Sequence, residues 1–295
     1  MGVRLPPPSP PRRSCAGDDG RLQRTPIEKL IGQLNRNPIF LRILNLRFKY
    51  GYRLLSRLLT KDDVLFLNYG YDEDPPMDLP LAASDESDRF AIQLYHRTAT
   101  QVDLAGKKVL EVSCGHGGGA SYLTRTQRPS SYTGLDLNTV GIEFCRKKHN
   151  LPGLDFVQGN AESLPFPDQS FDTVINVEAA INYQNVPRFF AEVERVLRAG
   201  GHFLYADVRY ADEIAGWEAE VANIPMRLVS EQVINAEVMR GLEKNRLVDQ
   251  ITRRLPKVAF LRGIANDYAG GRGSLIYRRL QTGEASYRLF CFAKD

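Results

Sequence analysis

The residues best suited to chemistry are three carboxylates, each placed where a predicted strand ends: Glu111, Asp136 and Glu178. A glycine-rich stretch, residues 114–119, follows the first of them. Glycines let a ligand approach the backbone closely, and a helix that begins at such a loop directs its free N–H groups to the same point. Asp136 follows the loop by about 20 residues, the spacing at which a carboxylate binds ribose hydroxyls. Together these residues predict a nucleoside site.

The loop alone leaves two kinds of ligand open, because it also satisfies the G-x-G-x-x-A pattern of nicotinamide and flavin enzymes. Three features argue against a hydride-transfer cofactor, and one of them is the apolar strand predicted at residues 170–178, which ends in a carboxylate and is followed by a helix, a Gly-Gly turn and a fifth strand. Glu111 would repel a pyrophosphate but attract a cation. Asn160 and Ala161 leave the predicted third strand with a polar side chain and a backbone N–H suited to an adenine edge. A nicotinamide oxidoreductase remains the alternative enzyme class.

Strands and helices must alternate to bring these residues together, because ligands bind at the carboxyl ends of parallel strands. Residues 89–102 predict a helix that leads into the first strand. After residues 191–199 the chain predicts a Gly-Gly turn and a fifth strand that ends at Asp207. The other predicted strands cover residues 109–112, 131–137, 170–178 and 287–293, and a third strand opens the region 154–166, with Asn160 and Ala161 at its exit.

Five motifs along these elements occur in the order and spacing of class I S-adenosylmethionine (SAM) methyltransferases: EVSCGHGGG, GLDLN, GNAESLPF, FDTVINVEA and RVLRAGGHFLYAD. The flanking text, such as NYGYDEDPPMDLPLAASDE and EASYRLFCFAKD, resembles the mycobacterial phthiotriol/phenolphthiotriol dimycocerosate methyltransferases over roughly residues 60–295. The resemblance implies an α/β fold, a Rossmann-like three-layer sandwich with a helical cap, and SAM as cofactor. It also implies O-methylation of a hydroxyl on a hydrophobic cell-envelope lipid. A hydroxy fatty acyl, glycolipid or polyketide acceptor is the alternative.

By the same resemblance, the motif residues would hold the cofactor. Asp136 would accept the ribose hydroxyls, and Glu111 would hold the methionine end directly or through water. Asn160 stands where the family more often has Asp, so an amide oxygen would replace a carboxylate at the adenine. The expected cofactor ligands are Glu111, Ser113, Gly115, Gly117, Asp136, Leu137, Asn160, Ala161, Glu162 and Val177.

The base for methyl transfer is harder to assign. An alcohol must lose its proton as the new C–O bond forms. Related methyltransferases often carry a histidine three or four residues after the Glu178 position, paired with an acid at the Asp207 position. Ile181 and Asn182 stand there in this chain. The candidate catalytic residues are Asp207, His96 and Glu178, with Tyr183, proton loss to water, or a SAM-binding protein with little turnover as alternatives. Asp207 as a structural cap and His96 as an ordinary helix residue also stay open.

Composition limits the class of protein and its cellular location. The 295 residues carry a net charge of +4, which does not indicate nucleic acid. The four cysteines have no C-x-x-C spacing, which fits a reducing cytoplasm and argues against zinc. The sequence has no apolar run long enough to span a bilayer and no signal peptide, which predicts a cytoplasmic protein.

Six segments follow from composition and pattern. The predicted division is a disordered tail (1–25), a basic amphipathic helical segment (26–61), a lead-in and lid helix (62–105), the SAM-binding core (106–208), a helical cap with the acceptor pocket (209–283) and a closing strand (284–295). The basic segment either lies on the anionic inner membrane face or packs its apolar stripe on the catalytic domain. Residues 209–283 have apolar residues at helical spacing, which predicts a greasy pocket for a long-chain acceptor.

Overall fold

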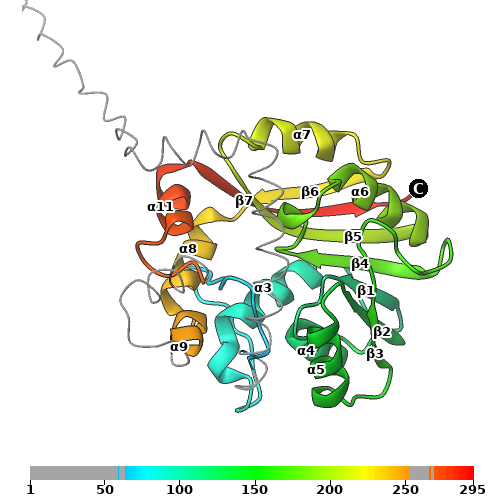
Figure 1. Ribbon diagram of the computed structural model, residues 1–295, viewed down its shortest axis with the longest axis horizontal. Coiled ribbons are helices and arrows are strands. Elements are labelled where there is room, and N and C mark those ends of the chain that lie inside the picture. Colours follow the sequence, from blue (N-terminus) through cyan, green and yellow to red (C-terminus); the bar gives the residue numbers. More distant parts are fainter. Residues whose placement is uncertain (1–58, 60–63, 253–265, 267–268) are drawn as a thin grey trace, which may run out of the picture. The chain divides into compact units, whose positions relative to one another are not determined.

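The computed structural model describes Leu59, residues 64–252, Asn266 and residues 269–295. The tail, almost all of the basic amphipathic segment, and most of residues 253–268 of the predicted cap lie outside these described residues. Figure 1 shows one twisted sheet with helices on both of its faces. None of the described helices is long and apolar enough to cross a bilayer.

The sheet has seven strands in the order β3-β2-β1-β4-β5-β7-β6. β1 to β5 run parallel, and β7 runs antiparallel to both of its neighbours, β5 and β6. Because parallel strands end at one edge, this order gathers the carboxyl ends of β1, β2 and β4. The strands are β1 (Lys108–Val112), β2 (Ser131–Asp136), β3 (Leu154–Gln158), β4 (Phe171–Val177), β5 (Leu197–Tyr210), β6 (Arg227–Val233) and β7 (Ala285–Ala293).

Two apolar cores form because successive strand residues point to opposite faces of the sheet. Val109 belongs to the core on the side of α3, α4 and α5, whereas Leu110 belongs to the core on the side of α6 and α7. The helices are η2 (Glu86–Asp88), α3 (Arg89–Ala99), α4 (Gly118–Gln127), α5 (Thr139–Lys148), η3 (Ala180–Asn182), α6 (Val186–Val196), α7 (Ile214–Ala222), α8 (Asn235–Lys244), α9 (Leu247–Thr252) and α11 (Leu275–Thr282).

Capping residues explain where several helices begin. The Asn138 side chain accepts the Val140 N–H at the start of α5, 3.2 Å away. Asn185 caps α6 in the same way, and Ser274 caps α11. Such a side chain satisfies one of the N–H groups that the first helical turn leaves unbonded.

The prediction of helices throughout residues 209–283 is wrong at Arg227–Val233, which form the edge strand β6. Leu228, Val229 and Val233 suggested an amphipathic helix, yet they lie on the exposed strand. Pairing with β7 decides their structure, and that partner is too distant in sequence to show in a local pattern. The helices α7, α8, α9 and α11 account for most of the other described residues of this segment.

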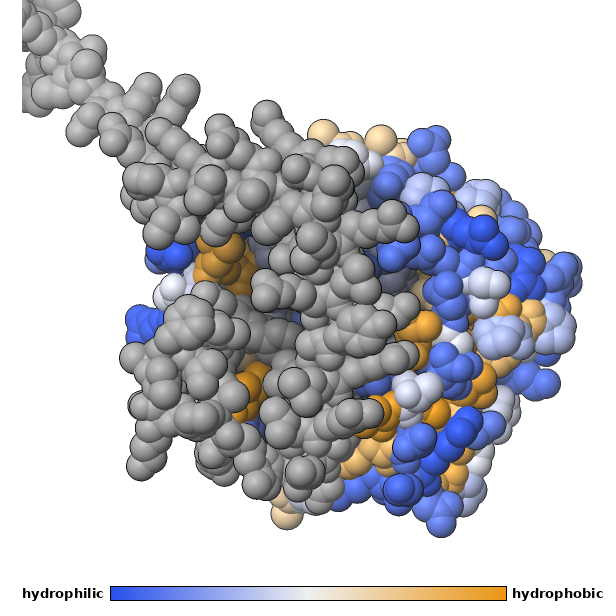
Figure 2. All heavy atoms as spheres, viewed as in Figure 1, coloured by the Kyte–Doolittle hydropathy of each residue, from blue (hydrophilic) through white to orange (hydrophobic). Residues whose placement is uncertain are grey.

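The described surface in Figure 2 consists of charged and polar residues with small apolar groups between them. Scattered apolar residues are normal on a protein surface in water.

Candidate functional site

Glu111, the last residue but one of β1, is almost completely buried, at 1% exposure. The hydroxyl of Tyr95 on α3 donates to its Oε1 at 2.9 Å, and the hydroxyl of Tyr132 on β2 donates to its Oε2 at 2.8 Å. Burial raises the pKa of Glu111 to about 7, and the nearby charge of Asp136 adds to the rise, while the two tyrosine hydrogen bonds oppose it. Its carboxylate keeps acceptor capacity beyond these two bonds, but because Glu111 is only 1% exposed, a direct bond to a ligand would need neighbouring groups to move.

Asp136 lies at the end of β2, next to the glycine loop, and is 7% exposed. Its Oδ2 accepts the N–H of Gly115 at 2.9 Å, and its Oδ1 accepts the N–H of Asn138 at 2.8 Å. Burial raises the pKa of Asp136 to about 6. A carboxylate has about four acceptor positions, so Asp136 keeps capacity for further hydroxyl donors. The next residue, Leu137, exposes 45% of its surface and offers an apolar contact beside that carboxylate.

The glycines of the loop serve the protein as well as any ligand. Gly117 has φ +76° at the start of α4, a conformation that favours glycine. A Cβ on Gly119 would lie 2.0 Å from the ring of Tyr95, and one on Gly118 would lie 2.6 Å from the carbonyl oxygen of Leu65. Close packing within the protein therefore requires glycine at positions 118 and 119. The sequence had predicted that these glycines make room for a ligand.

An extended segment, residues 64–72, lies across this loop, and we name it the lead-in strap. The Gly118 N–H donates to the Leu65 carbonyl at 3.2 Å, and the His116 ring bonds to the Val64 carbonyl at 2.7 Å. At its far end the strap reaches α8, where Lys244 forms an ion pair with Asp72 at 2.6 Å. The strap thus joins the glycine loop to the helices that follow β6.

The segment after β3 supplies the predicted adenine side of the site. Asn160 Oδ1 accepts the Glu162 N–H at 3.1 Å, and Ala161 is buried. Glu162 Oε1 accepts the N–H groups of Gln184 and Asn185 at 2.7 and 3.1 Å. Its carboxylate therefore holds the start of α6. Asn160, Ala161 and Glu162 remain predicted cofactor ligands, as do the buried Val177 and Ser113, which has φ +62°.

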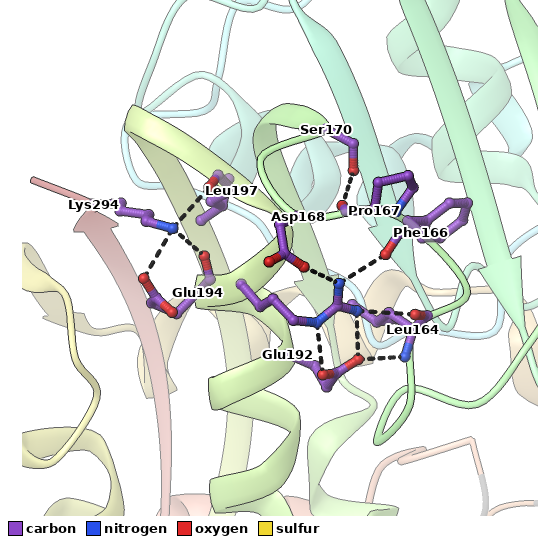
Figure 3. A network of polar contacts seen from close by, with 10 residues as sticks. Leu164, Phe166, Pro167, Asp168, Ser170, Glu192, Glu194, Leu197 and Lys294 are labelled. Carbon is purple, nitrogen blue, oxygen red and sulfur yellow. Dashed lines mark hydrogen bonds and ion pairs between the residues drawn. The ribbon is translucent and has the colours of Figure 1, made fainter.

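Figure 3 shows how α6 fixes the rest of that segment. The guanidinium of Arg195 donates to the carbonyls of Leu164 and Phe166 at 3.0 and 2.8 Å, and pairs with Asp168 at 2.8 Å. Glu192 accepts the Leu164 N–H at 2.7 Å and also pairs with Arg195. One ion-paired cluster therefore holds the connection between β3 and β4 against α6.

Glu178 follows β4 in a left-handed conformation, with φ +52°, and is partly exposed. The Tyr69 N–H, in the lead-in strap, donates to both of its carboxylate oxygens at 2.9 and 3.1 Å, and the Tyr287 hydroxyl donates to Oε1 at 2.8 Å. Burial raises the pKa of Glu178 to about 8, and the charge of Asp207 adds to the rise. This carboxyl group is therefore mostly protonated at pH 7 and half-ionised at about pH 8.

Asp207 is completely buried, at 0% exposure. It forms an ion pair with Arg209 at 2.9 Å and accepts the Ile181 N–H at 2.9 Å and the Tyr205 hydroxyl at 3.0 Å. Its own neighbour Val208 donates a fourth bond at 2.9 Å. With these donors around it, Asp207 holds η3 in place and presents no surface to an acceptor.

His96 and Tyr183 lie apart from Glu178 in the described contacts. His96 Nδ1 bonds to the Tyr122 hydroxyl on α4 at 2.9 Å, and burial lowers the pKa of its ring. The Tyr183 hydroxyl bonds to Ser113 Oγ at 2.6 Å and accepts the Asn176 amide at 2.9 Å. The structure thus brings Glu178 and Asp207 together, but it does not join His96 to either of them.

Three tyrosines that donate to Glu111 or Glu178 were not predicted from the sequence: Tyr69, Tyr132 and Tyr287. Glu178 and its two donors are 109 positions apart in each direction, so no local spacing connects them. For Tyr132 and Tyr287 the available signal is general, since a buried tyrosine hydroxyl needs a hydrogen-bond partner, whereas Tyr69 donates its backbone N–H, which its side chain does not reveal.

Comparison with known proteins identifies the family. A family model described as a methyltransferase domain matches residues 110–205. The phthiotriol/phenolphthiotriol dimycocerosates methyltransferase of Mycobacterium tuberculosis (strain ATCC 25618 / H37Rv) is 59% identical over 250 residues, which cover 84% of this chain and 92% of the relative. The chain belongs to this methyltransferase family. A fatty-acid O-methyltransferase of Mycolicibacterium smegmatis is 52% identical over 83% of this chain and 89% of its own length.

Solved structures agree on the fold of this methyltransferase. The [4+2]-cyclase SpnF superposes with a TM-score of 0.64 at 18% identity, over 83% of this chain and 94% of the cyclase. A geranyl diphosphate C-methyltransferase from Streptomyces coelicolor A3(2), crystallised with S-adenosylhomocysteine, gives 0.57 at 14% identity, over 80% and 93% of the two chains. The predicted Rossmann-like class I fold is confirmed, and the protein is a SAM-dependent methyltransferase.

The strand-end residues of this methyltransferase suit SAM. Within residues 64–252 and 269–295, none of Glu111, Asp136 and Glu178 forms an ion pair with Lys or Arg, so no protein cation competes with a cationic ligand for these carboxyl groups when they ionise. Asp136 has acceptor capacity for ribose hydroxyls, and Leu137 offers an apolar surface next to it. These acidic and apolar side chains fit a nucleoside that carries a positive charge.

Proposed function

We propose that this methyltransferase transfers a methyl group to a hydroxyl of a long-chain lipid of the phthiotriol/phenolphthiotriol dimycocerosate type. The 59% identity to a relative with that name supports the acceptor class. Glu178 supports the reaction, because it is a partly exposed carboxyl group after β4, the strand that pairs with β1, and its pKa lies at about 8. A general base works best when its pKa is near the working pH.

Each side chain of the site has a separate task. SAM, when bound, supplies an electrophilic methyl group on a positively charged sulfur. Asp136 and Leu137 hold the nucleoside, and Glu111 places negative charge near the methionine end. Glu178 takes up the proton of the lipid hydroxyl while the oxygen of that hydroxyl forms its bond to the methyl carbon. Asp207 keeps η3, the turn after Glu178, in position through the Ile181 N–H.

A fatty acid is the second candidate acceptor, favoured by the 52% identity to a fatty-acid O-methyltransferase. A carboxylate acceptor is already ionised at neutral pH and needs no base. Glu178 would then be dispensable for proton removal. A hydroxy fatty acyl, glycolipid or polyketide hydroxyl would use Glu178 in the same way as the leading candidate.

The acceptor is tested by incubating the purified protein and its Glu178→Gln variant with SAM and either a phthiotriol-type lipid or a free fatty acid. Mass spectrometry should detect one added CH₂ on the hydroxyl lipid, and Glu178→Gln should lower that rate by about 10²-fold or more. Methyl esters of the fatty acid alone, formed equally by both proteins, would refute the hydroxyl proposal.

We also propose that the basic amphipathic segment, residues 26–61, attaches the enzyme to anionic membrane surfaces where such lipids reside. Arginines repeat among its apolar residues, for example Arg42, Arg47 and Arg53. The full-length protein should sediment with phosphatidylglycerol vesicles at low salt and much less at high salt. Replacement of these three arginines by glutamate should abolish sedimentation, and equal binding of the variant would refute the proposal.

A further inference from the structure

We infer that the hydroxyl of Tyr287, on the closing strand, positions Glu178 and tunes its ionisation. The inference rests on the proposed function, since it concerns how the base of that reaction is held. Tyr287 acts through Glu178 and does not touch the acceptor. It is therefore a positioning residue.

Tyr287 is held firmly enough to direct a neighbour. It lies on β7 opposite Val208 of β5, and it is completely buried. Its N–H donates to Asn235 Oδ1 at 2.6 Å, and its carbonyl accepts the Ile234 N–H at 2.9 Å. The same Asn235 side chain donates to the Ala285 carbonyl at 2.9 Å. The junction between β6 and α8 therefore fixes the backbone from which the Tyr287 hydroxyl reaches Glu178.

Both groups on the Glu178 carboxylate are donors. The Tyr69 N–H can only donate, and burial keeps the pKa of Tyr287 well above its ordinary value, so its hydroxyl retains the proton that it donates. Donors stabilise the ionised form of a carboxylate. They oppose burial, the largest influence on Glu178, which favours the neutral form.

The other ionisable groups around Glu178 come from β5 and α3. Asp207 on β5 raises the pKa of Glu178 through its negative charge, although Arg209 pairs with it. Tyr95 on α3 lies within electrostatic range of Glu178, but its hydroxyl donates to Glu111. Of the side chains that the structure describes near Glu178, Tyr287 is thus the one whose hydroxyl bonds to it directly.

The test compares pH profiles of kcat at saturating SAM for the wild type, Tyr287→Phe, Glu178→Gln and the double variant. In Tyr287→Phe, the rising limb should move upward by about one pH unit, because a hydrogen bond to a charged group is lost. The rate at pH 7 should fall by roughly 3- to 10-fold and recover above about pH 9. In the Glu178→Gln background, Tyr287→Phe should cause no further change in the profile.

A second measurement does not depend on turnover. The protonated Glu178 carboxyl group should give an infrared C=O band that disappears in Glu178→Gln and titrates with a higher midpoint in Tyr287→Phe. If wild-type protein methylates no hydroxyl lipid, the proposed function fails, yet this titration still tests the bond between Tyr287 and Glu178. An unchanged limb and an unchanged infrared midpoint in Tyr287→Phe would overturn the inference.

Tyr277→Phe is the matched control, because Tyr277 on α11 donates its hydroxyl to Glu243, away from the strand-end acids. It should leave the pH profile unchanged. Affinity for S-adenosylhomocysteine and the thermal unfolding midpoint establish that each variant is folded. If Tyr287→Phe folds poorly, Asn235→Ala keeps the hydroxyl but releases the Tyr287 backbone, and it should give a smaller upward shift of the same limb.

Discussion

Asp207 was predicted to end the fifth strand, but β5 continues to Tyr210, and the buried acid has only protein partners among its described contacts. Its charge is neutralised by Arg209, whose guanidinium also lies 4.9 Å from the centre of the Trp217 ring. A buried ion pair contributes little net stability when it is intact, but loss of one partner leaves an uncompensated charge in the interior. Asp207 therefore supports the site through η3, and its removal acts first on folding.

Asp207→Asn should lower the free energy of unfolding by about 3 to 5 kcal/mol, because Arg209 is left buried without its counter-charge. Urea denaturation followed by circular dichroism measures this change. Asp172→Asn is the control, since Asp172 pairs with Arg198 at 2.9 Å on a side chain that is 25% exposed and should cost about 1 kcal/mol or less. Equal stability of Asp207→Asn and wild type, with lost activity, would instead indicate a direct catalytic role.

At this scale the acids were predictable and their partners were not. Glu111, Asp136 and Glu178 each follow a short apolar run, and parallel strands must end together, so the sequence indicates both their positions and their common edge. The tyrosine donors of Glu111 and Glu178 come from the lead-in strap, α3, β2 and β7. Those contacts depend on how distant elements pack, which spacing along the chain does not encode.

Among the elements, the lead-in strap and α8 meet at an unusually close crossing. A Cβ on Gly241 of α8 would lie 2.1 Å from the carbonyl carbon of Gly70, and one on Gly70 would lie 2.5 Å from the Gly241 carbonyl oxygen. The strap residue just before this crossing, Tyr69, donates its N–H to Glu178. Displacement of α8 from the strap would therefore disturb the hydrogen bond from Tyr69 to Glu178, the proposed base.

Gly241→Ala should destabilise the protein by about 1 to 3 kcal/mol, because backbone atoms must move to admit the methyl group. It should also lower kcat by displacing Tyr69. Thermal unfolding and the methyl-transfer assay measure the two effects. Gly216→Ala on α7 is the matched control: a Cβ there would meet no atom of another element within 4 Å, and alanine should stabilise that helix by up to about 1 kcal/mol. Wild-type stability and kcat in Gly241→Ala would show that the strap and α8 can move apart without effect on the site.

For the whole molecule, Glu111, Asp136 and Glu178 all hold protons in the folded state at pH values where the unfolded chain has lost them, since burial raises their pKa values to about 7, 6 and 8. Stability must then fall as pH rises through these values. Histidines with lowered pKa, such as His116, act in the opposite direction, but only below about pH 6.5. The effect of the acids is therefore cleanest above that pH.

Between about pH 6.5 and 8.5, the free energy of unfolding of the cofactor-free protein should fall by on the order of 1 to 2 kcal/mol, chiefly through Glu178 and Glu111. Urea denaturation at several pH values measures the slope. Glu178→Gln removes one of the two groups and should show a shallower decline. A flat or rising profile in the wild type would mean that these carboxyl groups are ionised in the folded protein.

The placement of β7 between β5 and β6 has a consequence for biosynthesis. β6 leaves the ribosome before the strand that will become its neighbour, with α8, α9 and α11 still to be made between them. During that interval β5 and β6 both expose unpaired backbone edges, and β6 also carries Leu228, Val229 and Val233. Exposed strand edges are templates for aggregation. The nascent chain is therefore most in need of a chaperone between the synthesis of β6 and the insertion of β7.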